Sequence, residues 1–389
     1  MRQAGKASSF KDASDDLLEL ACVSISPNHL SKIAERIGKE WQTFRDRDVQ
    51  AFRENQLKPQ YAEPPKVACA MVDGGRAQTR DEDSGNGVSG QAWQEVKVAC
   101  CQSMSSVVSA IDPQPEPPSK FLDRIEVARL TAEIKSRGGK AVARAEKKAP
   151  KQQKKQKKSK RPEKRVRTVV ASMSSSEEFG WHMAAEVQRR GLGSAERKGY
   201  ICDGLKYNWT LYEMHLQPQG FIAILDFLHL LAYLYTAAMA VEGKGTVQAW
   251  TCYERWLRQA WSGQVKELLV GLKEGCGKLG AVPEGCSEDD PRKVAADALG
   301  YVTNNQKRMD YARYRKLGLP ISSAAVESVM KQMNKRMKGT EKFWLEGGAE
   351  AMVQIRAAYL SEDGRADRYW ALPRPYSPAV GSGRFQRKS

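Results

Sequence analysis

The sequence predicts a mixed α/β fold, because short apolar runs of strand length alternate with longer segments of helical periodicity. Residues 66–72, 198–202 and 221–225 are runs of strand length, and an aspartate follows each of them directly. A helix-rich block, residues 230–320, comes after the third run. With 389 residues the chain can bury one full core and still carry additions to it.

The first part of the chain predicts a helical N-terminal element, residues 1–60. Leu30, Ile33 and Ile37 recur at helical spacing within residues 27–57. Such a helix could contact DNA, but packing against the rest of the protein is the better interpretation without a second helix at turn spacing. Two strands then follow, residues 66–72 and 93–101, and the Asp-, Ser- and Gly-rich stretch 78–91 joins them as a hairpin loop.

A strongly basic segment, residues 135–167, interrupts the predicted core. It contains sixteen Lys or Arg and two Glu, a net charge of +14 out of +17 for the whole chain. Such a charge run predicts a solvated, disordered linker. A flexible polycation still binds phosphates by releasing counterions, so we expect DNA contacts from this segment. The candidate residues are Lys154, Lys155, Lys157 and Lys158.

The second half of the chain predicts a strand, a helical insertion and a final pair of helices. The apolar stretch 221–241 contains Asp226 and His229, which favours a buried strand followed by a core helix over a membrane span. The insertion clusters Trp250, Trp256 and Trp261 and is interrupted by a Gly- and Pro-rich patch, residues 271–291. Residues 321–371 complete the core, and residues 372–389 predict a mobile tail.

The cysteines and the N-terminus indicate a cytoplasmic protein. Eight cysteines show no Cys-x-x-Cys pair, and several lie inside apolar runs, where cysteine is an ordinary core residue. No apolar stretch follows the N-terminal basic residues in the manner of a secretory signal. We therefore expect no membrane partner.

The acidic residues at the ends of the apolar runs indicate a site for divalent cations. Asp73, Asp203 and Asp226 would each lie at the rim of a sheet, and Glu327 lies on a helix that runs to about residue 337. Several carboxylates that converge at one rim bind hard cations such as Mg²⁺, which prefers oxygen ligands. Two such cations about 3.5–4 Å apart suit in-line displacement at a phosphorus. The sequence therefore predicts metal-dependent phosphodiester chemistry.

Each of these residues also has an ordinary structural interpretation. Asp203 and Asp226 could cap the helices that follow them, and Glu327 could pair with Lys331 one turn later. His229, three residues after Asp226, could be a core histidine. The three tryptophans of the insertion could stack on unpaired bases, although their helical spacing favours core packing.

Six motifs in order resemble those of a bacterial insertion-sequence transposase, of the ISKra-type branch of the Mutator-like DDE transposases. They are Val-Asp73-Gly-Gly-Arg, Trp93-Gln-Glu-Val-Lys, Asp203-Gly-Leu-Lys-Tyr-Asn-Trp, Ile-Leu-Asp226-Phe-Leu-His229, Ala-Val-Glu327-Ser and the stretch from Trp344 to Asp363. The resemblance covers residues 28–371. It implies an RNase H-like mixed sheet interrupted by a helical insertion, with the core divided between residues 64–229 and 321–371.

The resemblance also implies the roles of individual residues. Asp73 matches the first catalytic acid, Glu327 the last and Asp203 the second, and these three would hold two Mg²⁺ or Mn²⁺ ions. Asp226 is the rival for the second acid, and with His229 it matches an accessory motif. The basic side of the Glu327 helix, Lys331, Lys335, Arg336 and Lys338, would lie near the DNA backbone.

The function implied is cleavage and rejoining of DNA at the ends of a mobile element. The partners implied are terminal inverted repeats, target DNA and further copies of this chain, because two element ends must be handled together. A stand-alone RNase H-like nuclease and a non-catalytic DNA-binding relative are the alternatives. Strand joining separates the first from a transposase, and a missing acid would mark the second.

Overall fold

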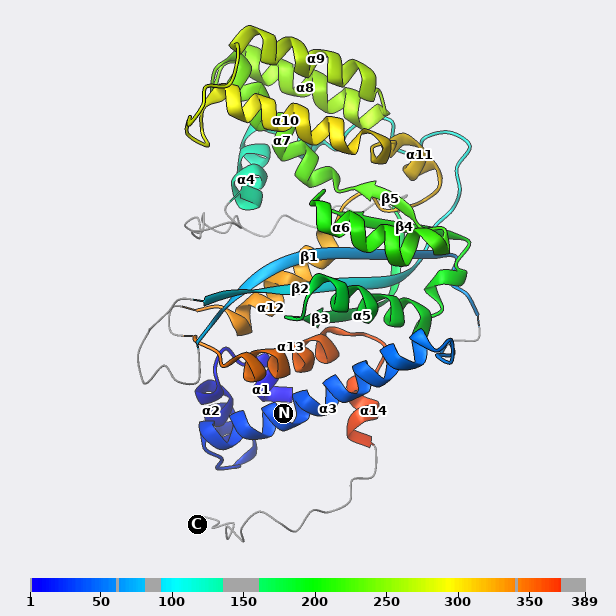
Figure 1. Ribbon diagram of the computed structural model, residues 1–389, viewed down its shortest axis with the longest axis vertical. Helices are drawn as coiled ribbons and strands as arrows, with labels where there is room; N and C mark the ends of the chain where they lie inside the picture. Colours follow the sequence, from blue (N-terminus) through cyan, green and yellow to red (C-terminus); the bar gives the residue numbers. More distant parts are fainter. Residues whose placement is uncertain (1, 61–62, 81–91, 136–160, 340–341, 372–389) are drawn as a thin grey trace.

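The computed structural model describes residues 2–60, 63–80, 92–135, 161–339 and 342–371. Five strands lie in one mixed sheet, and their bounds are β1 (Val67–Thr79), β2 (Ala92–Ser105), β3 (Glu163–Ser172), β4 (Arg197–Cys202) and β5 (Ile222–Leu225). Their spatial order is β3-β2-β1-β4-β5, and helices pack on both faces of the sheet (Figure 1). The predicted α/β class is therefore confirmed.

The strand directions divide the sheet into two parts. β1, β2 and β3 are antiparallel neighbours, whereas β4 and β5 run parallel to β1 and to each other. The predicted hairpin is confirmed, but both of its strands are longer than expected. Residues 73–79 are glycine-rich and polar, and they continue the ladder with β2 down to the pair Thr79↔Ala92. Because this extension lacks an apolar alternation, its sequence does not predict a strand.

The basic linker predicted over residues 135–167 is too long at its C-terminal end. β3 begins at Glu163 and is an edge strand of the sheet. Its first three residues, Glu163, Lys164 and Arg165, are charged and exposed. Charged residues are common on edge strands because they discourage pairing with another chain. The helix α4 (Arg124–Lys135) precedes the segment. The four lysines predicted to contact DNA, residues 154, 155, 157 and 158, lie outside the described residues.

Helices cover the two faces and the β3 edge of the sheet. α12 (Ala324–Met337) and α5 (Ser176–Arg189) pack on opposite faces, while α13 (Glu346–Leu360) lies beside α12 (Figure 1). α3 (Pro27–Arg53) crosses α13 and α5 at the β3 edge. A Cβ atom on Gly38 would lie 2.4 Å from the carbonyl oxygen of Ala351, so this crossing requires a glycine. The N-terminal helices therefore pack against the core, which agrees with the packing interpretation.

Several shorter elements complete the layer around the sheet. They are α1 (Arg2–Lys6), α2 (Phe10–Ala21), η1 (Ser119–Phe121), η3 (Leu192–Ser194), α6 (Lys206–Leu211), η4 (Tyr212–Leu216), η5 (Gln217–Gln219) and α14 (Arg365–Ala371).

Helices fill residues 227–316, where the insertion was predicted. They are α7 (Phe227–Glu242), α8 (Val247–Ser262), α9 (Val265–Leu279), α10 (Pro291–Asn305), η6 (Gln306–Arg308) and α11 (Tyr311–Lys316). They form the upper part of Figure 1, and α7 joins them to the sheet through β5. The predicted interruption at residue 271 is wrong, because α9 continues to Leu279. Gly271 lets α9 approach Trp256 closely, since a Cβ atom there would lie 2.6 Å from the indole nitrogen.

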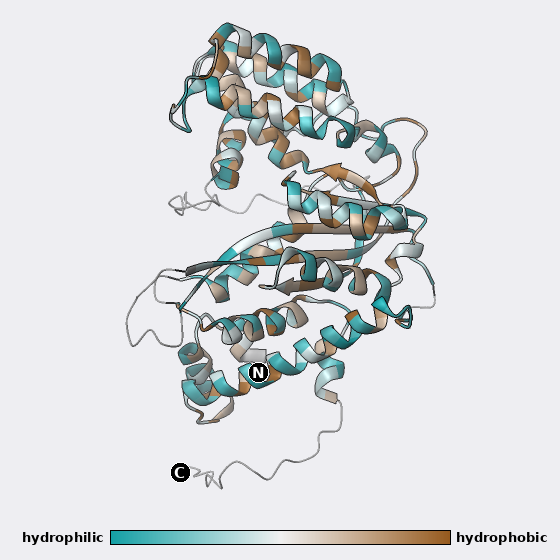
Figure 2. Ribbon diagram, viewed as in Figure 1, coloured by the Kyte–Doolittle hydropathy of each residue, from teal (hydrophilic) through white to brown (hydrophobic). Residues whose placement is uncertain are grey.

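The apolar stretch and the tryptophans of the insertion both belong to the interior. β5, the last strand of the sheet, and much of α7 are hydrophobic (Figure 2), and many of their side chains are buried. Among the described residues, no helix has the length and apolar character needed to cross a bilayer. Trp256 and Trp261 are buried and Trp250 is half-buried, which supports core packing for the first two.

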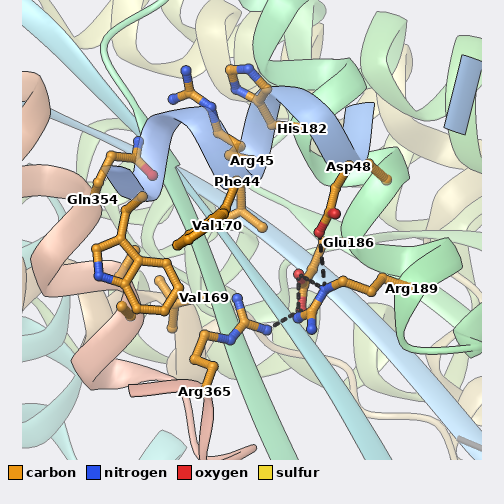
Figure 3. Close-up of a pocket in the computed structure, with 14 residues that line it drawn as sticks. Phe44, Arg45, Asp48, Val169, Val170, His182, Glu186, Arg189, Gln354 and Arg365 are labelled. Atoms are coloured by element: carbon orange, nitrogen blue, oxygen red, sulfur yellow. Dashed lines mark hydrogen bonds and ion pairs between the residues drawn. The ribbon is translucent and has the colours of Figure 1, made fainter. Parts of the chain in front are cut away.

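A cavity of about 110 Å³ at the β3 edge is bordered by α3, β3, α5 and α13 (Figure 3). Its charged groups pair with one another: the buried Glu186 carboxylate lies 2.7 Å from Arg189 and 2.6 Å from Arg365. Asp363 also contacts both arginines. Because these charges are paired inside the protein, we interpret the network as a structural link between α5 and the segment that follows α13.

His182 lies in the same cavity and is held in its neutral form. Burial lowers its pKa, and the positive charge of Arg45 lowers it further, to about 3. The unfolded chain therefore binds a proton that the folded chain does not bind between pH 6.5 and about pH 3. Folding stability consequently falls as the pH decreases through this window.

We predict that His182→Gln flattens the acid side of the pH–stability profile. Wild type should lose up to about 1.4 kcal/mol per pH unit more than the variant between about pH 6 and pH 4. Urea unfolding at several pH values measures this difference. The contributions of titratable groups that both proteins share cancel when the two profiles are subtracted. Parallel profiles would show that His182 accepts a proton in the folded state.

Candidate active site

Three aspartates lie on three neighbouring strands at the same level of the sheet: Asp73 within β1, Asp203 directly after β4 and Asp226 directly after β5. The parallel pairing of β1 with β4 ends at Met71 and Ile201, and that of β4 with β5 ends at Cys202 and Leu225. If both registers are continued to the next residues, Asp203 lies beside Asp73 on one side and beside Asp226 on the other. The strand register therefore brings the three predicted acids into one row.

Asp226 is fully buried and is held by three hydrogen bonds. Its Oδ1 atom accepts the Ser323 N–H at 2.8 Å, and its Oδ2 atom accepts the His229 N–H at 3.1 Å and the His229 Nδ1–H at 2.5 Å. The bond to the His229 N–H caps α7, so the capping interpretation is confirmed for this residue. Both carboxylate oxygens are thus already engaged by the protein.

The same contacts close the base of the helical insertion. The chain leaves the sheet after Asp226 and returns at Ile321–Ser323. The Phe227 N–H donates to the Ile321 carbonyl at 3.0 Å, next to the Asp226–Ser323 bond. Because Ser323 directly precedes α12, these bonds fix where the helix that carries Glu327 begins.

Asp203 is half-buried and is oriented by its own loop. Its Oδ1 atom accepts the Leu205 N–H at 3.1 Å and the Asn208 side-chain N–H at 2.9 Å. Gly204 has a φ of 93°, and a Cβ atom there would lie 2.9 Å from the Tyr301 ring. The Tyr301 hydroxyl donates to the Asp203 carbonyl at 2.7 Å, so α10 supports this loop from the insertion.

Glu327 is buried in the first turn of α12 and accepts a hydrogen bond from the Ser323 hydroxyl at 3.3 Å. α12 can lie close to β1 because Gly75 has no side chain; a Cβ atom there would lie 2.6 Å from the Met330 sulfur. Ligand atoms of Glu327, Asp226 and His229 all lie within 4.8 Å of one another. Helix α12 thus delivers the fourth carboxylate to the β5 end of the row.

His229 is positively charged at neutral pH. Burial lowers its pKa, but the hydrogen bond and charge of Asp226, with the charges of Asp203 and Glu327, outweigh burial and raise the pKa to about 9. Burial raises the pKa of Asp226, but the hydrogen bond and the charge of His229 outweigh burial and keep the Asp226 pKa below its usual value. The imidazolium therefore partly neutralises the acidic row.

A cavity of about 530 Å³ opens in front of the row. Asp73, Asp203 and His229 line it, together with Arg76 of β1 and Lys135 of α4. The insertion contributes an acidic wall, Glu288, Asp289 and Asp297. A negatively charged phosphate is therefore favoured on the Arg76 side of the cavity and disfavoured on the insertion side.

The predicted DNA-contacting residues of α12 fall into two groups. Lys331 and Lys335 are exposed, and Lys331 pairs with Glu133 of α4 rather than with Glu327. Arg336 is buried, so the structure contradicts its predicted contact with DNA. Its guanidinium lies over the rings of Phe10 and Trp344, at 4.4 and 5.0 Å, and its Nε–H donates to the Ala4 carbonyl.

Several cavity residues were not predicted as functional. Arg76 is exposed and follows Asp73 in the Asp-Gly-Gly-Arg motif, whose arginine was the available signal. Tyr207 donates to Glu95 at 3.2 Å, and burial followed by the charge of Glu95 raises its pKa, so it stays protonated. Lys338, which was predicted to lie near the DNA backbone, lies near Arg76, and burial and then the charge of Arg76 lower its pKa.

The donor set fits hard divalent cations. Asp73 of β1 and Asp203 after β4 line the cavity, and Glu327 of α12 belongs with Asp226 and His229 to a group whose ligand atoms lie within 4.8 Å of one another. Carboxylate oxygens are the ligands that Mg²⁺ and Mn²⁺ accept. Asp73, Asp203 and Glu327 are the residues that would hold such ions. Asp226 fits less well as a ligand, because hydrogen bonds from Ser323 and His229 occupy both of its oxygens.

Comparisons of this chain with protein-family models, with curated proteins and with solved structures give no match. The functional assignment therefore depends on the site and on the motifs in the sequence.

We predict that Asp226→Asn lowers the free energy of unfolding by about 1–3 kcal/mol, because the amide has one acceptor oxygen instead of two and loses the charged hydrogen bond to His229. Asp73→Asn should leave stability unchanged or increase it, because it removes one of several like charges. Denaturant unfolding without added metal compares the two variants. Equal losses of stability in both would contradict a structural role specific to Asp226.

Proposed function

We propose that this protein is a DNA transposase that cleaves the ends of an insertion sequence and joins them to target DNA. The observation that carries the proposal is the shared register of Asp73, Asp203 and Asp226, with Glu327 supplied to the same row by α12. These are the positions that the motifs in the sequence assign to the catalytic acids. A cavity in front of the row gives a DNA strand room to enter.

The sheet supports the finer proposal of an RNase H-like fold. Such folds have three antiparallel strands followed by two parallel ones, with the first strand in the centre. Here β1 is central, β2 and β3 are antiparallel neighbours on one side, and β4 and β5 are parallel to β1 on the other. The first acid on β1, the second after β4 and the last on a later helix agree with that family.

The proposed ligand set is Asp73, Asp203 and Glu327, with two Mg²⁺ or Mn²⁺ ions. When bound, these ions polarise the phosphate and stabilise the attacking and leaving oxygens. Asp203 is preferred to Asp226 as the second acid for two reasons. First, Asp203 lines the cavity. Second, the hydrogen bonds from the Asp203 loop go to its Oδ1 atom, whereas both oxygens of Asp226 accept hydrogen bonds.

The remaining residues of the site bind and orient the strand. Arg76 lines the cavity and Lys338 lies near it, so both provide positive charge where a phosphate backbone would lie. Lys335 is exposed on the same helix as Glu327. His229, held as an imidazolium by Asp226, has its second ring nitrogen available to donate to a phosphate oxygen. Tyr207, fixed by Glu95, limits the cavity next to Asp203.

The proposal is tested by Mn²⁺-dependent cleavage and strand joining on DNA that carries the inverted repeats flanking the gene. We predict that Asp73→Asn, Asp203→Asn and Glu327→Gln each reduce cleavage by roughly a thousandfold or more while DNA binding persists. Asp367→Asn, an exposed acid of α14, is the matched control and should retain wild-type activity.

The other outcomes identify the alternatives. Cleavage without joining would make the protein a nuclease, and DNA binding without either reaction would make it a non-catalytic relative. Asp226→Asn could fold normally and lose all cleavage while Asp203→Asn stays active. That result would identify Asp226, at the end of β5, as the second acid.

A further inference from the structure

The loop that carries Asp203 lies beyond the hydrogen-bonded part of the sheet. The ladder between β4 and β5 ends at the pair Cys202↔Leu225, and the Asp226 N–H then donates to the Cys202 carbonyl at 2.9 Å. Asp203 comes next and is half-buried, with Asp73 and Asp226 on either side of it in the row. Because like charges repel one another, Asp203 needs contacts from outside the sheet to stay in this position.

Tyr301 of α10 provides one such contact. Its hydroxyl donates to the backbone carbonyl of Asp203 at 2.7 Å, across 98 residues of sequence. Its ring is fixed within the insertion, because it stacks on Tyr233 of α7 with centroids 3.9 Å apart and planes inclined by 14°. Gly204 permits the approach, since a Cβ atom there would lie 2.9 Å from the Tyr301 ring and 3.3 Å from the Asn305 side chain. The Asp203 loop and α10 are therefore in direct contact.

Asn305, one turn further along α10, provides a second contact with the same loop. Its Oδ1 atom accepts the indole N–H of Trp209 at 3.0 Å, and the guanidinium of Arg308 lies 4.2 Å from the centre of the Trp209 ring. The residue before Trp209, Asn208, is fully buried, and its side chain donates to the Asp203 Oδ1 atom at 2.9 Å. The insertion thus holds this loop at both ends, at the Asp203 carbonyl and next to the amide that binds the Asp203 carboxylate.

We propose that Tyr301 is a positioning residue for Asp203, so that the helical insertion is part of the metal site. The Tyr301 hydroxyl fixes the peptide that follows β4, and this peptide sets the direction of the Asp203 side chain. Residues that orient metal ligands typically contribute about 10–100-fold to metal affinity. The inference rests on the proposed role of Asp203 as a metal ligand, whereas the contact between Tyr301 and Asp203 does not.

The test compares two variants of the full-length protein that each lose one hydroxyl. Tyr301→Phe removes the bond to Asp203 and keeps the ring on Tyr233. Tyr253→Phe is the matched control, because the Tyr253 hydroxyl of α8 donates to the Phe121 carbonyl at 2.9 Å and the variant loses the same kind of bond elsewhere in the insertion. A bond that only stabilises the fold would lower stability in either variant without changing the affinity for metal.

Two readouts follow the position of Asp203 without reference to DNA cleavage. The first is Mn²⁺ binding, measured from the free Mn²⁺ signal in electron paramagnetic resonance. Tyr301→Phe should bind Mn²⁺ about tenfold more weakly than wild type with the same number of ions, and Tyr253→Phe should bind like wild type. The second is hydrogen–deuterium exchange without metal. The Leu205 amide, which donates to the Asp203 Oδ1 atom, should exchange about threefold or more faster in Tyr301→Phe alone.

Equal Mn²⁺ binding by the two variants, or equal exchange of the Leu205 amide in both, would overturn the positioning role of Tyr301. A wild type that binds Mn²⁺ but cleaves no DNA would contradict the transposase proposal and leave this one standing. A wild type that binds no Mn²⁺ would show that the proposed ligand set is wrong, and the exchange of the loop would then decide whether Tyr301 positions Asp203. The two failures are therefore distinguishable.

Discussion

The arrangement of the acidic row depends on the buried carboxylate of Asp226. It caps α7 at the point where the chain leaves the sheet and accepts the Ser323 N–H where the chain returns. The helices of the insertion lie between these two points in the sequence, yet one side chain joins the two ends. Without this bond, the start of α12, and therefore the position of Glu327, would follow the movements of the insertion. The Asp226 carboxylate thus connects the end of β5 to the start of the helix that carries Glu327.

Accumulating like charges at one sheet edge opposes folding, and the structure offsets this in part with His229. The histidine is charged because the row around it is negative, which its raised pKa of about 9 reflects. The chain as a whole is strongly basic, but the cavity has an acidic wall on the insertion side and cations on the sheet side. A strand attracted by the overall charge would therefore enter in one orientation, with its backbone toward Arg76.

Much of the site could be predicted from single apolar runs, because an apolar run that ends at an aspartate is visible in the sequence. Asp73, Asp203 and Asp226 were found in this way, but their common level depends on register, which no run reveals. The hydrogen bond between Asp226 and the Ser323 N–H joins residues far apart in the chain, which no local pattern reveals. Arg336 shows the opposite failure: its spacing on α12 suggests a basic face, whereas α1 and α2 fold over it. The start of β3 was missed because its exposed charges look like a linker.

Anomalous scattering from a crystal of the protein grown with Mn²⁺ tests the account most directly, since it locates the ions without reference to activity. If Asp73, Asp203 and Glu327 hold the ions, two Mn²⁺ peaks will lie between these residues, and the hydrogen bonds of Asp226 to Ser323 and His229 will be intact. A single peak bound by Asp226, His229 and Glu327, or no peak in the row at all, would contradict it.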